Sequence, residues 1–405
     1  MLKYGLYKFP KMAAKQPNIA LPLKLTFLIF SMVLNCMGIV ILQLSEQNIT
    51  YDKLGFLESF KDIPIAIFSL FAVNFISRFG TKKSLIFALM LVGTCSLFLP
   101  FVEVFWFFKL WFAIIGTCFA IGKICVYGII RNNMTEEKSL AQTMNSVEAS
   151  FMIGIFTVNT GFGWLISSQF GEYWKFGFMS ISLISFFTVY LFSKIKIAEP
   201  ENKTTRIFPD LSGFGKKTII LFFAVSFFII FIEQSFNSWL PSFYKDHLKV
   251  NSFFALQASS FLALFSYTGR TITSKIIQRF SLSKYFMFCV MMIIFLLIII
   301  SGLQFYFSEN TKVLLFLFPV IGLFLSPLYP VINSKMIAKI EKNKINTFTS
   351  LIVSVSSISS SINSISISIL FKNQILTYYS LYILGAVIMV SVLAYSYFKL
   401  SSDRI

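Results

Sequence analysis

Three charged residues stand inside a strongly apolar stretch near the start of the chain. Glu58, Lys61 and Asp62 occupy positions i, i+3 and i+4, so a helix places them on one face near its outer end. Inside a membrane, carboxylates and an ammonium group at this spacing can pair, contact a polar solute or exchange a proton. Two interpretations stay open: a network facing a cavity, and a cluster paired with itself at the level of the lipid headgroups.

A second set of polar residues follows in the segment IGKICVYGIIR, where Lys123 and Tyr127 are one helical turn apart. Lys123 lies roughly 12 Å inside the helix end, a depth at which an ammonium group facing lipid is costly. Glu148 begins the next apolar run, which returns antiparallel. We therefore predict that Lys123 and Glu148 face one cavity, close enough to pair directly or across one substrate group or water. The alternative is that the lysine reaches the surface along its own helix.

The second half of the chain carries fewer such residues. Glu233 and Asn237 lie in FIIFIEQSFNSWLP, and Arg270 lies in SYTGR. In the first apolar run, the amide of Asn35 either lines a cavity or bonds a neighbouring helix.

Two prolines three residues apart, Pro327 and Pro330, stand in the apolar run that contains SPLYPVINS. Each removes a backbone donor and clashes with the preceding turn, so we expect a break in this helix that acts as a gate.

These residues belong to twelve apolar runs, each long enough to cross a hydrocarbon core of about 30 Å. Six runs precede and six follow the polar segment KIKIAEPENKTTRIFPDLSGFGKK. In one run serine alternates with isoleucine, but an open strand cannot cross lipid, so this run is also expected to be a helix whose serines allow close packing or form a polar face. The runs cover roughly 22–44, 53–79, 84–102, 105–130, 144–168, 174–193, 217–242, 252–274, 281–303, 312–338, 346–371 and 376–398.

The composition indicates an integral membrane protein, because 56% of the residues are hydrophobic and 13% are charged. The net charge of +18 arises from Lys and Arg between the apolar runs, which favours a topology bias over nucleic-acid binding. Segments expected inside hold 25 Lys and Arg, and the outside loops hold five. We therefore predict an all-α protein of the plasma membrane (the bacterial inner membrane) with both termini cytoplasmic.

The predicted topology divides the chain into five parts. They are a basic cytoplasmic tail (1–21), an N-terminal six-helix half (22–193), a cytoplasmic linker (194–216), a C-terminal six-helix half (217–398) and a cytoplasmic tail (399–405).

The sequence offers little material for an enzyme, a metal centre or a cofactor site. The five cysteines all fall inside apolar runs without a CxxC spacing, and His247 is the only histidine. No nucleophile and base are assembled, and no Walker motif is present. We therefore expect no enzymatic activity, no metal and no cofactor.

The loop NFISRFGTKKS resembles the signature of the major facilitator superfamily between its second and third helices. Arg78, Gly80 and Lys82 fit that signature, whereas Ser77 replaces its aspartate and Val73 its first glycine. The resemblance implies the major facilitator fold, with two halves of six helices, and a loop that holds one conformation.

Short patches are similar to the fucose and glucose/galactose proton symporters of that superfamily: LAQTMNS, the SWLP stretch, Gly269-Arg270 and SPLYP. The proton-carrying carboxylates of that branch belong in the middle of the first and fourth helices, where this chain has Gly38 and the Val126-Tyr127 region. If proton coupling is retained, the available replacements are Glu58, Asp62 and Glu148.

We expect a monomeric secondary transporter that moves a small polar solute across the bilayer by alternating access, with protons as the candidate coupling ion. Lys61, Lys123 and Arg270 together favour an anion such as a sugar acid, whereas the patches of similarity favour a neutral sugar. Efflux of apolar compounds and a non-transporting receptor or scaffold with the same fold are the alternatives.

Overall fold

The computed structural model describes residues 19–46, 51–133, 136–195, 197, 216–250, 252–306, 313–341, 344–372 and 375–402. Within these residues every regular element is a helix. Most of the expected linker (194–216) falls outside the described residues, as do residues 1–18 and 403–405 of the expected tails, whereas helices include 20–21 and 399–402. The long helices are α1 (Ala20–Asn35), α2 (Met37–Glu46), α3 (Tyr51–Phe79), α4 (Thr81–Phe98), α5 (Phe105–Asn133), α6 (Glu137–Ser167), α7 (Gly177–Lys194), α8 (Lys216–Asp246), α9 (Ser252–Ile276), α10 (Leu282–Tyr306), α11 (Leu314–Leu325), α12 (Leu328–Ile337), α13 (Ile345–Lys372) and α14 (Tyr379–Ser402).

The predicted all-α membrane protein is confirmed. In the described part of the chain, 11 helical segments are long and apolar enough to cross a membrane, and the 25-residue helix α9 is the twelfth crossing. Many aromatic and aliphatic side chains remain exposed on the outside of the bundle, among them Phe71, Trp164 and Leu183. Such a surface is suited to lipid rather than to water.

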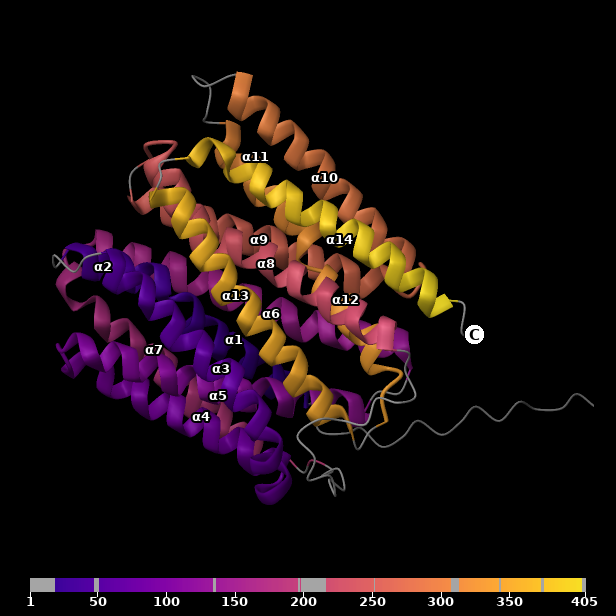
Figure 1. The fold of residues 1–405 in the computed structure, drawn as a ribbon. Coiled ribbons are helices and arrows are strands. Elements are labelled where there is room, and N and C mark those ends of the chain that lie inside the picture. Colours follow the sequence, from indigo (N-terminus) through magenta and orange to yellow (C-terminus); the bar gives the residue numbers. More distant parts are fainter. Residues whose placement is uncertain are drawn as a thin grey trace, which may run out of the picture.

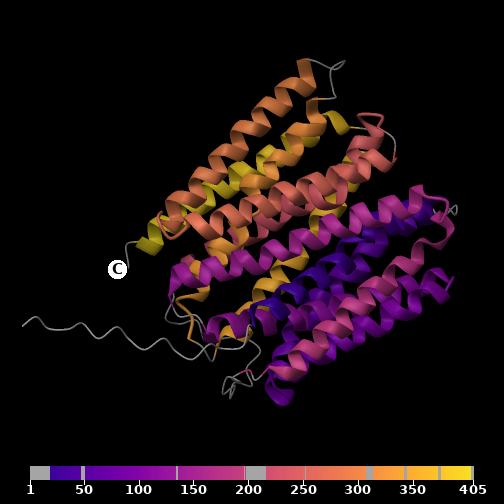
Figure 2. The same cartoon turned by 180° about the vertical axis from the view of Figure 1, so that it is seen from behind.

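The helices form two bundles that lie against each other along their length, with α1 to α7 in one and α8 to α14 in the other (Figures 1 and 2). Two helix pairs make the main contacts between the bundles, α6 with α9 and α3 with α13. We call the end of the bundle at Lys194 and Lys216, which flank the central segment, the linker end. The cavity described below lies between these contacting pairs.

Two of the expected runs are interrupted. The run expected at 312–338 forms α11 and α12, separated by a turn at Ser326 and Pro327, where the two prolines predict a break. The run expected at 22–44 also divides, into α1 and α2, because Cys36 has a ψ of −2° instead of the helical value near −42°. This second break was not predicted, since no proline marks it.

The serine-rich segment is helical, as predicted, and forms α13. Its alternating pattern is overridden because a membrane-spanning segment must satisfy its own backbone groups. Helix α6 begins at Glu137, before the expected boundary at 144, since its first turns carry polar residues that a hydrophobic run does not include.

Candidate functional site

A cavity lies between the two bundles, near the middle of the helices. Eight of the predicted residues line it: Asn35, Lys61, Asp62, Lys123, Glu148, Glu233, Asn237 and Arg270. Glu58 and Tyr127 stand behind this lining and bond to members of it. Three serines of α13 (Ser356, Ser357 and Ser360) also line it, and a polar face was one of the two interpretations of this serine-rich run. Three aromatic rings that line it (Phe119, Phe151 and Tyr329) were not singled out, because rings are common in membrane helices and their type alone gives no signal.

Glu58, Lys61 and Asp62 of α3, which we call the α3 cluster, are buried at the interface of the bundles. Lys61 Nζ lies 3.7 Å from a carboxylate oxygen of Glu58 and 3.7 Å from one of Asp62. One ammonium group therefore serves two carboxylates, as their spacing on one helical face predicts. Both carboxylates also accept hydrogen bonds from side chains of other helices.

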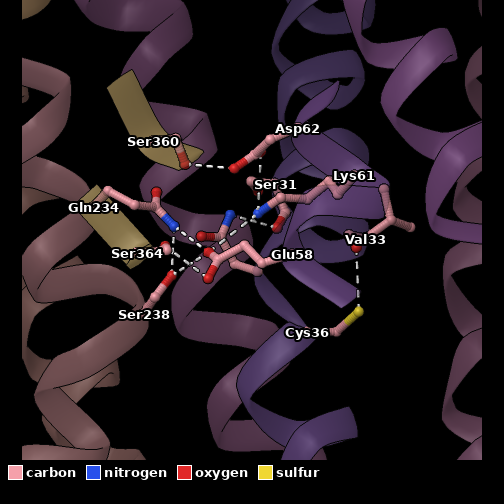
Figure 3. A network of polar contacts seen from close by, with 11 residues as sticks. Ser31, Val33, Cys36, Glu58, Lys61, Asp62, Gln234, Ser238, Ser360 and Ser364 are labelled. Atoms are coloured by element: carbon pink, nitrogen blue, oxygen red, sulfur yellow. Dashed lines mark hydrogen bonds and ion pairs between the residues drawn. The ribbon is translucent and has the colours of Figure 1, made fainter. Parts of the chain in front are cut away.

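The donors of these hydrogen bonds belong to the C-terminal bundle (Figure 3). Gln234 and Ser238 of α8 donate to Glu58 Oε1 at 2.7 and 2.9 Å. Ser364 and Ser360 of α13 donate to Glu58 Oε2 and Asp62 Oδ2, both at 2.8 Å. The cluster is thus hydrogen-bonded across the two bundles and is not paired with itself alone.

A second network is centred on Arg270 of α9, whose side chain is 2% exposed. Its Nη1 donates to the Glu148 carboxylate at 3.1 Å and to the Glu148 backbone carbonyl at 2.7 Å. Its Nη2 donates to Glu233 Oε1 at 2.8 Å, and its Nε donates to the Ser326 carbonyl at 2.9 Å. The guanidinium therefore joins an acid of the N-terminal bundle to an acid and a helix break of the C-terminal bundle.

Lys123 and Glu148 do face one another, with 3.9 Å between Nζ and Oε1. The shorter contacts of Glu148 are with Arg270 and with the Tyr127 hydroxyl, which donates at 2.7 Å. Lys123 is also held over the ring of Tyr329, 4.6 Å from its centroid, where the ring quadrupole attracts a cation. The pairing of Glu148 with Lys123 alone was therefore an incomplete prediction, because its main cationic partner comes from the other half of the chain.

The charges of the cavity lining balance. Three cations, Lys61, Lys123 and Arg270, face three carboxylates, and each cation lies within ion-pair distance of at least one acid. An anionic solute would have to displace one of these carboxylates, since none of the three cations is left over.

The segment with Arg78, Gly80 and Lys82, which resembles the superfamily signature, lies at the linker end, where α3 meets α4. Gly80 has a φ of 89°, a backbone conformation that favours glycine and turns the chain between the two helices. Lys82 Nζ donates to the carbonyls of Ser193 and Ile195 at the end of α7. Arg78 is exposed and lies over the Phe79 ring.

The two bundles also meet at the linker end. Arg131, at the end of α5, donates to the carbonyls of Ile337, Ala338 and Ile340 at 3.2, 3.0 and 3.3 Å. Lys138 donates to the Gln278 carbonyl at 2.8 Å. At the opposite end Thr160 of α6 donates to Ser260 of α9 at 3.1 Å. The cavity is therefore bordered by contacts between the bundles on both sides.

Among the described residues, no group of three or more His, Cys, Asp or Glu side chains is placed to hold a metal ion. All five cysteines lie in the described residues and none is in a disulfide bond, and four of them are buried.

A family model, that of the Major Facilitator Superfamily, matches residues 24–364. The chain is a member of this superfamily. It is thus a membrane transporter by family and by fold, and not an enzyme. No curated protein matches it.

Solved structures share the fold at low identity. The chain is 14% identical to the major facilitator transporter FucP in its outward conformation, with 94% of this chain and 98% of that chain covered and a TM-score of 0.71. It is 15% identical to a single-residue variant of the E. coli fucose:proton symporter FucP, with 94% and 98% covered and a TM-score of 0.69. It is 13% identical to the proton:xylose symporter XylE bound to 6-bromo-6-deoxy-D-glucose, with 94% and 95% covered and a TM-score of 0.75.

Proposed function

We propose that this protein is a secondary active transporter that carries a small neutral polar solute of the sugar type through the central cavity by alternating access. The observation that carries the proposal is the lining of that cavity: balanced charges, amides, serine hydroxyls and aromatic rings from both bundles. Of the two polar solute classes that the sequence left open, the neutral one fits this lining better than the anionic one.

The ion pairs of the cavity disfavour an anion. A carboxylate or phosphate needs a cation with free donors, but Arg270 already serves Glu148 and Glu233, and Lys61 serves Glu58 and Asp62. A neutral polyol can exchange hydrogen bonds with these polar groups without breaking a buried pair, which is costly.

The cavity lining combines hydrogen-bond donors, acceptors and aromatic rings, which suits a sugar. Asn35 and Asn237 offer both donors and acceptors, and Ser356 and Ser357 add hydroxyls. The rings of Phe119, Phe151 and Tyr329 offer flat apolar surfaces against which the C–H face of a pyranose can pack. Apolar compounds would leave these polar groups without partners, which disfavours efflux of such compounds.

We further propose that protons drive uptake and that Glu148 carries them. The structurally similar FucP and XylE are named as proton symporters. Glu148 lies in the cavity lining and bonds directly to Arg270, which holds the opposite bundle. A proton on Glu148 would remove its charge, weaken the contact with Arg270 and so let the bundles move relative to one another.

The same proposal includes the location and the assembly. The 25 basic residues of the segments on one side support a cytoplasmic linker end in the plasma membrane of a bacterial cell, and we propose that the chain acts there as a monomer.

Uptake into proteoliposomes tests the proposal. The purified protein is offered radiolabelled pentoses, hexoses and hexuronates, with and without an inward proton gradient. We expect accumulation of at least one neutral sugar that depends on the gradient, and loss of accumulation in Glu148→Gln with exchange retained. Uptake of hexuronates alone would replace the neutral solute by an anion. No uptake of any solute would favour a receptor or scaffold.

A further inference from the structure

Prolines inside the helices of the C-terminal bundle leave backbone carbonyls without their helical donors. Pro319 in α11 removes the N–H that would bond the Leu315 carbonyl, and the Tyr244 hydroxyl of α8 donates to that oxygen at 3.1 Å. Pro241 in α8 does the same to the Asn237 carbonyl, toward which the Ser259 hydroxyl of α9 points at 3.5 Å. Side chains of neighbouring helices thus replace the missing backbone donors.

The break between α11 and α12 follows the same rule, but with a charged donor. Pro330 removes the helical donor of the Ser326 carbonyl, and Arg270 Nε supplies one at 2.9 Å. Pro327 removes the donor of the Leu323 carbonyl, which lies so close to Gly269 that no Cβ would fit there. Gly269 and Arg270 therefore dock α9 directly onto both carbonyls of the break.

The donor at Ser326 is also the residue that holds the cavity acids. The same guanidinium bonds Glu148 in the N-terminal bundle and Glu233 in α8. Tyr244 and Ser259, by contrast, donate to backbone carbonyls and, within the described part of the chain, bond no acid of the cavity. Of these three sites, only the break has a replacement donor that depends on the charges around the solute.

Helix α12 connects the break to the linker end. Its last residues present the carbonyls that Arg131 of α5 binds, and Lys335 of α12 lies 3.8 Å from Glu137 of α6. Arg270 therefore holds the turn that precedes α12, and groups of the N-terminal bundle hold its last turn.

We propose that Arg270 is a positioning residue that transmits the state of the cavity to α12 through the Ser326 carbonyl. This rests on the proposed transport function. When a proton neutralises the Glu148 carboxylate, or solute displaces it, Arg270 loses its ion pair with the N-terminal bundle and keeps only the Glu148 backbone carbonyl there, so the guanidinium shifts toward Glu233 and leaves the Ser326 carbonyl. The Ser326 carbonyl then has no side-chain donor, and the chain bends further at Ser326 and Pro327. As a result, the last turn of α12 moves away from α5 and α6 at the linker end.

Hydrogen exchange of the full chain in lipid nanodiscs, followed by mass spectrometry, tests the proposal without any solute. Arg270→Lys keeps the charge near Glu148 and Glu233 but lacks the forked donor set that reaches Ser326 at the same time. We expect exchange over residues 331–341 to become about tenfold faster, the size expected from loss of a hydrogen bond with a charged donor. Residues 81–98 of α4, in the other bundle, should change by less than about twofold.

Pro330→Ala provides the decisive comparison, because an alanine at this position would restore a backbone N–H for the Ser326 carbonyl. This variant alone should slow exchange over 331–341. In its background Arg270→Lys should have an effect of less than about twofold, since the carbonyl no longer depends on Arg270. Pro319→Ala is the matched control: it restores a donor in the neighbouring helix α11, away from Arg270, so the tenfold effect of Arg270→Lys should persist there.

Two results would overturn the relay: unchanged exchange over 331–341 in Arg270→Lys, or an equal effect of Arg270→Lys with and without Pro330→Ala. If Arg270→Lys does not fold, Pro330→Ala and Glu148→Gln still decide: relative to residues 81–98 of α4, which report any loss of overall stability, the first must slow and the second must speed exchange over 331–341. Because exchange needs no transported solute, failure of the relay and failure of the transport proposal are distinguishable.

Discussion

At the scale of single residues, the ion pairs between buried acids and bases define the centre of this protein. Arg270 contacts two acids, Glu148 contacts Arg270 and Lys123, and Lys61 serves both acids of the α3 cluster. Removing one member of such a set leaves an uncompensated charge in a low-dielectric region, so the cost depends on how many partners the remaining members keep.

Glu148→Gln should destabilise the protein more than Lys123→Gln. The first variant leaves Lys123 without an acid within ion-pair distance, whereas the second leaves Glu148 with Arg270 and Tyr127. We expect a loss of about 3–5 kcal/mol for Glu148→Gln, as for other broken buried pairs, and a smaller loss for Lys123→Gln. Thermal unfolding of the purified variants in detergent measures the order.

The double variant Lys123→Gln with Glu148→Gln is the control for that order. It keeps Arg270 with Glu233 and removes one charge of each sign, so it should be more stable than Glu148→Gln alone. An equal or lower stability of the double variant would show that Lys123 does not depend on Glu148.

Lys61→Met should be among the most damaging substitutions, because it leaves Glu58 and Asp62 together without their shared cation. The loss should again be about 3–5 kcal/mol, seen as poor expression and early unfolding. Adding Asp62→Asn removes one of the two repelling charges and should recover part of the stability. If Lys61→Met expresses and unfolds like the unmodified protein, the cluster is better solvated than its burial indicates.

At the scale of elements, close helix contacts and helix breaks shape the cavity. Glycines permit the closest approaches: α6 meets α1 at Gly154, and α9 meets α11 at Gly269. Small residues of this kind let membrane helices approach each other without a hydrophobic driving force between them. The proline break of α11 and α12 and the turn at Cys36 lie where cavity-lining helices change direction.

Gly154→Ala should push α6 away from α1, because an added Cβ would lie 2.5 Å from the Leu28 carbonyl oxygen. We expect a destabilisation of about 1–3 kcal/mol, typical of overpacking. Gly161→Ala in the same helix is the matched control, since its Cβ would meet nothing within 4 Å. Thermal unfolding of both variants gives the comparison, and similar losses for the two would place the α1–α6 contact elsewhere than at Gly154.

At the scale of the whole molecule, two bundles of helices meet along α3 with α13 and α6 with α9. Polar groups connect the bundles at four levels: the α3 cluster, the Arg270 network, the contacts of Arg131 at the linker end and the contact of Thr160 with Ser260 at the opposite end. Alternating access requires that the contacts at one end part while those at the other end close, so these levels are the places where motion must exchange hydrogen bonds.

The orientation in the membrane gives a prediction at this scale. Single cysteines at Thr204 and Arg404, two positions outside the described residues, should resist an impermeant maleimide applied to intact cells, because basic segments remain cytoplasmic. A cysteine at Glu172, exposed at the opposite end, should react and serves as the positive control. Labelling of Thr204→Cys and Arg404→Cys from outside would reverse the predicted topology.

Much of the fold follows from the sequence alone, because a bilayer restricts the alternatives. Each crossing must be about 20 residues long and must satisfy its own backbone hydrogen bonds, so apolar runs become helices, including the serine-rich α13. Depth in the membrane also follows from position along a run. For this reason a cavity was predicted for the charges of α5 and α6, and it was one of two interpretations for those of α3.

The partners of those charges were decided only by the tertiary structure. Glu148 and Arg270 are 122 positions apart, and Glu58 and Gln234 are 176 apart. A run of apolar residues states how deep a side chain lies, but not which helix of the other bundle faces it. The facing helix depends on how the two bundles pack. Pro330 in the sequence predicts that the Ser326 carbonyl lacks its helical donor, but only the packing of the bundles brings Arg270 to that carbonyl.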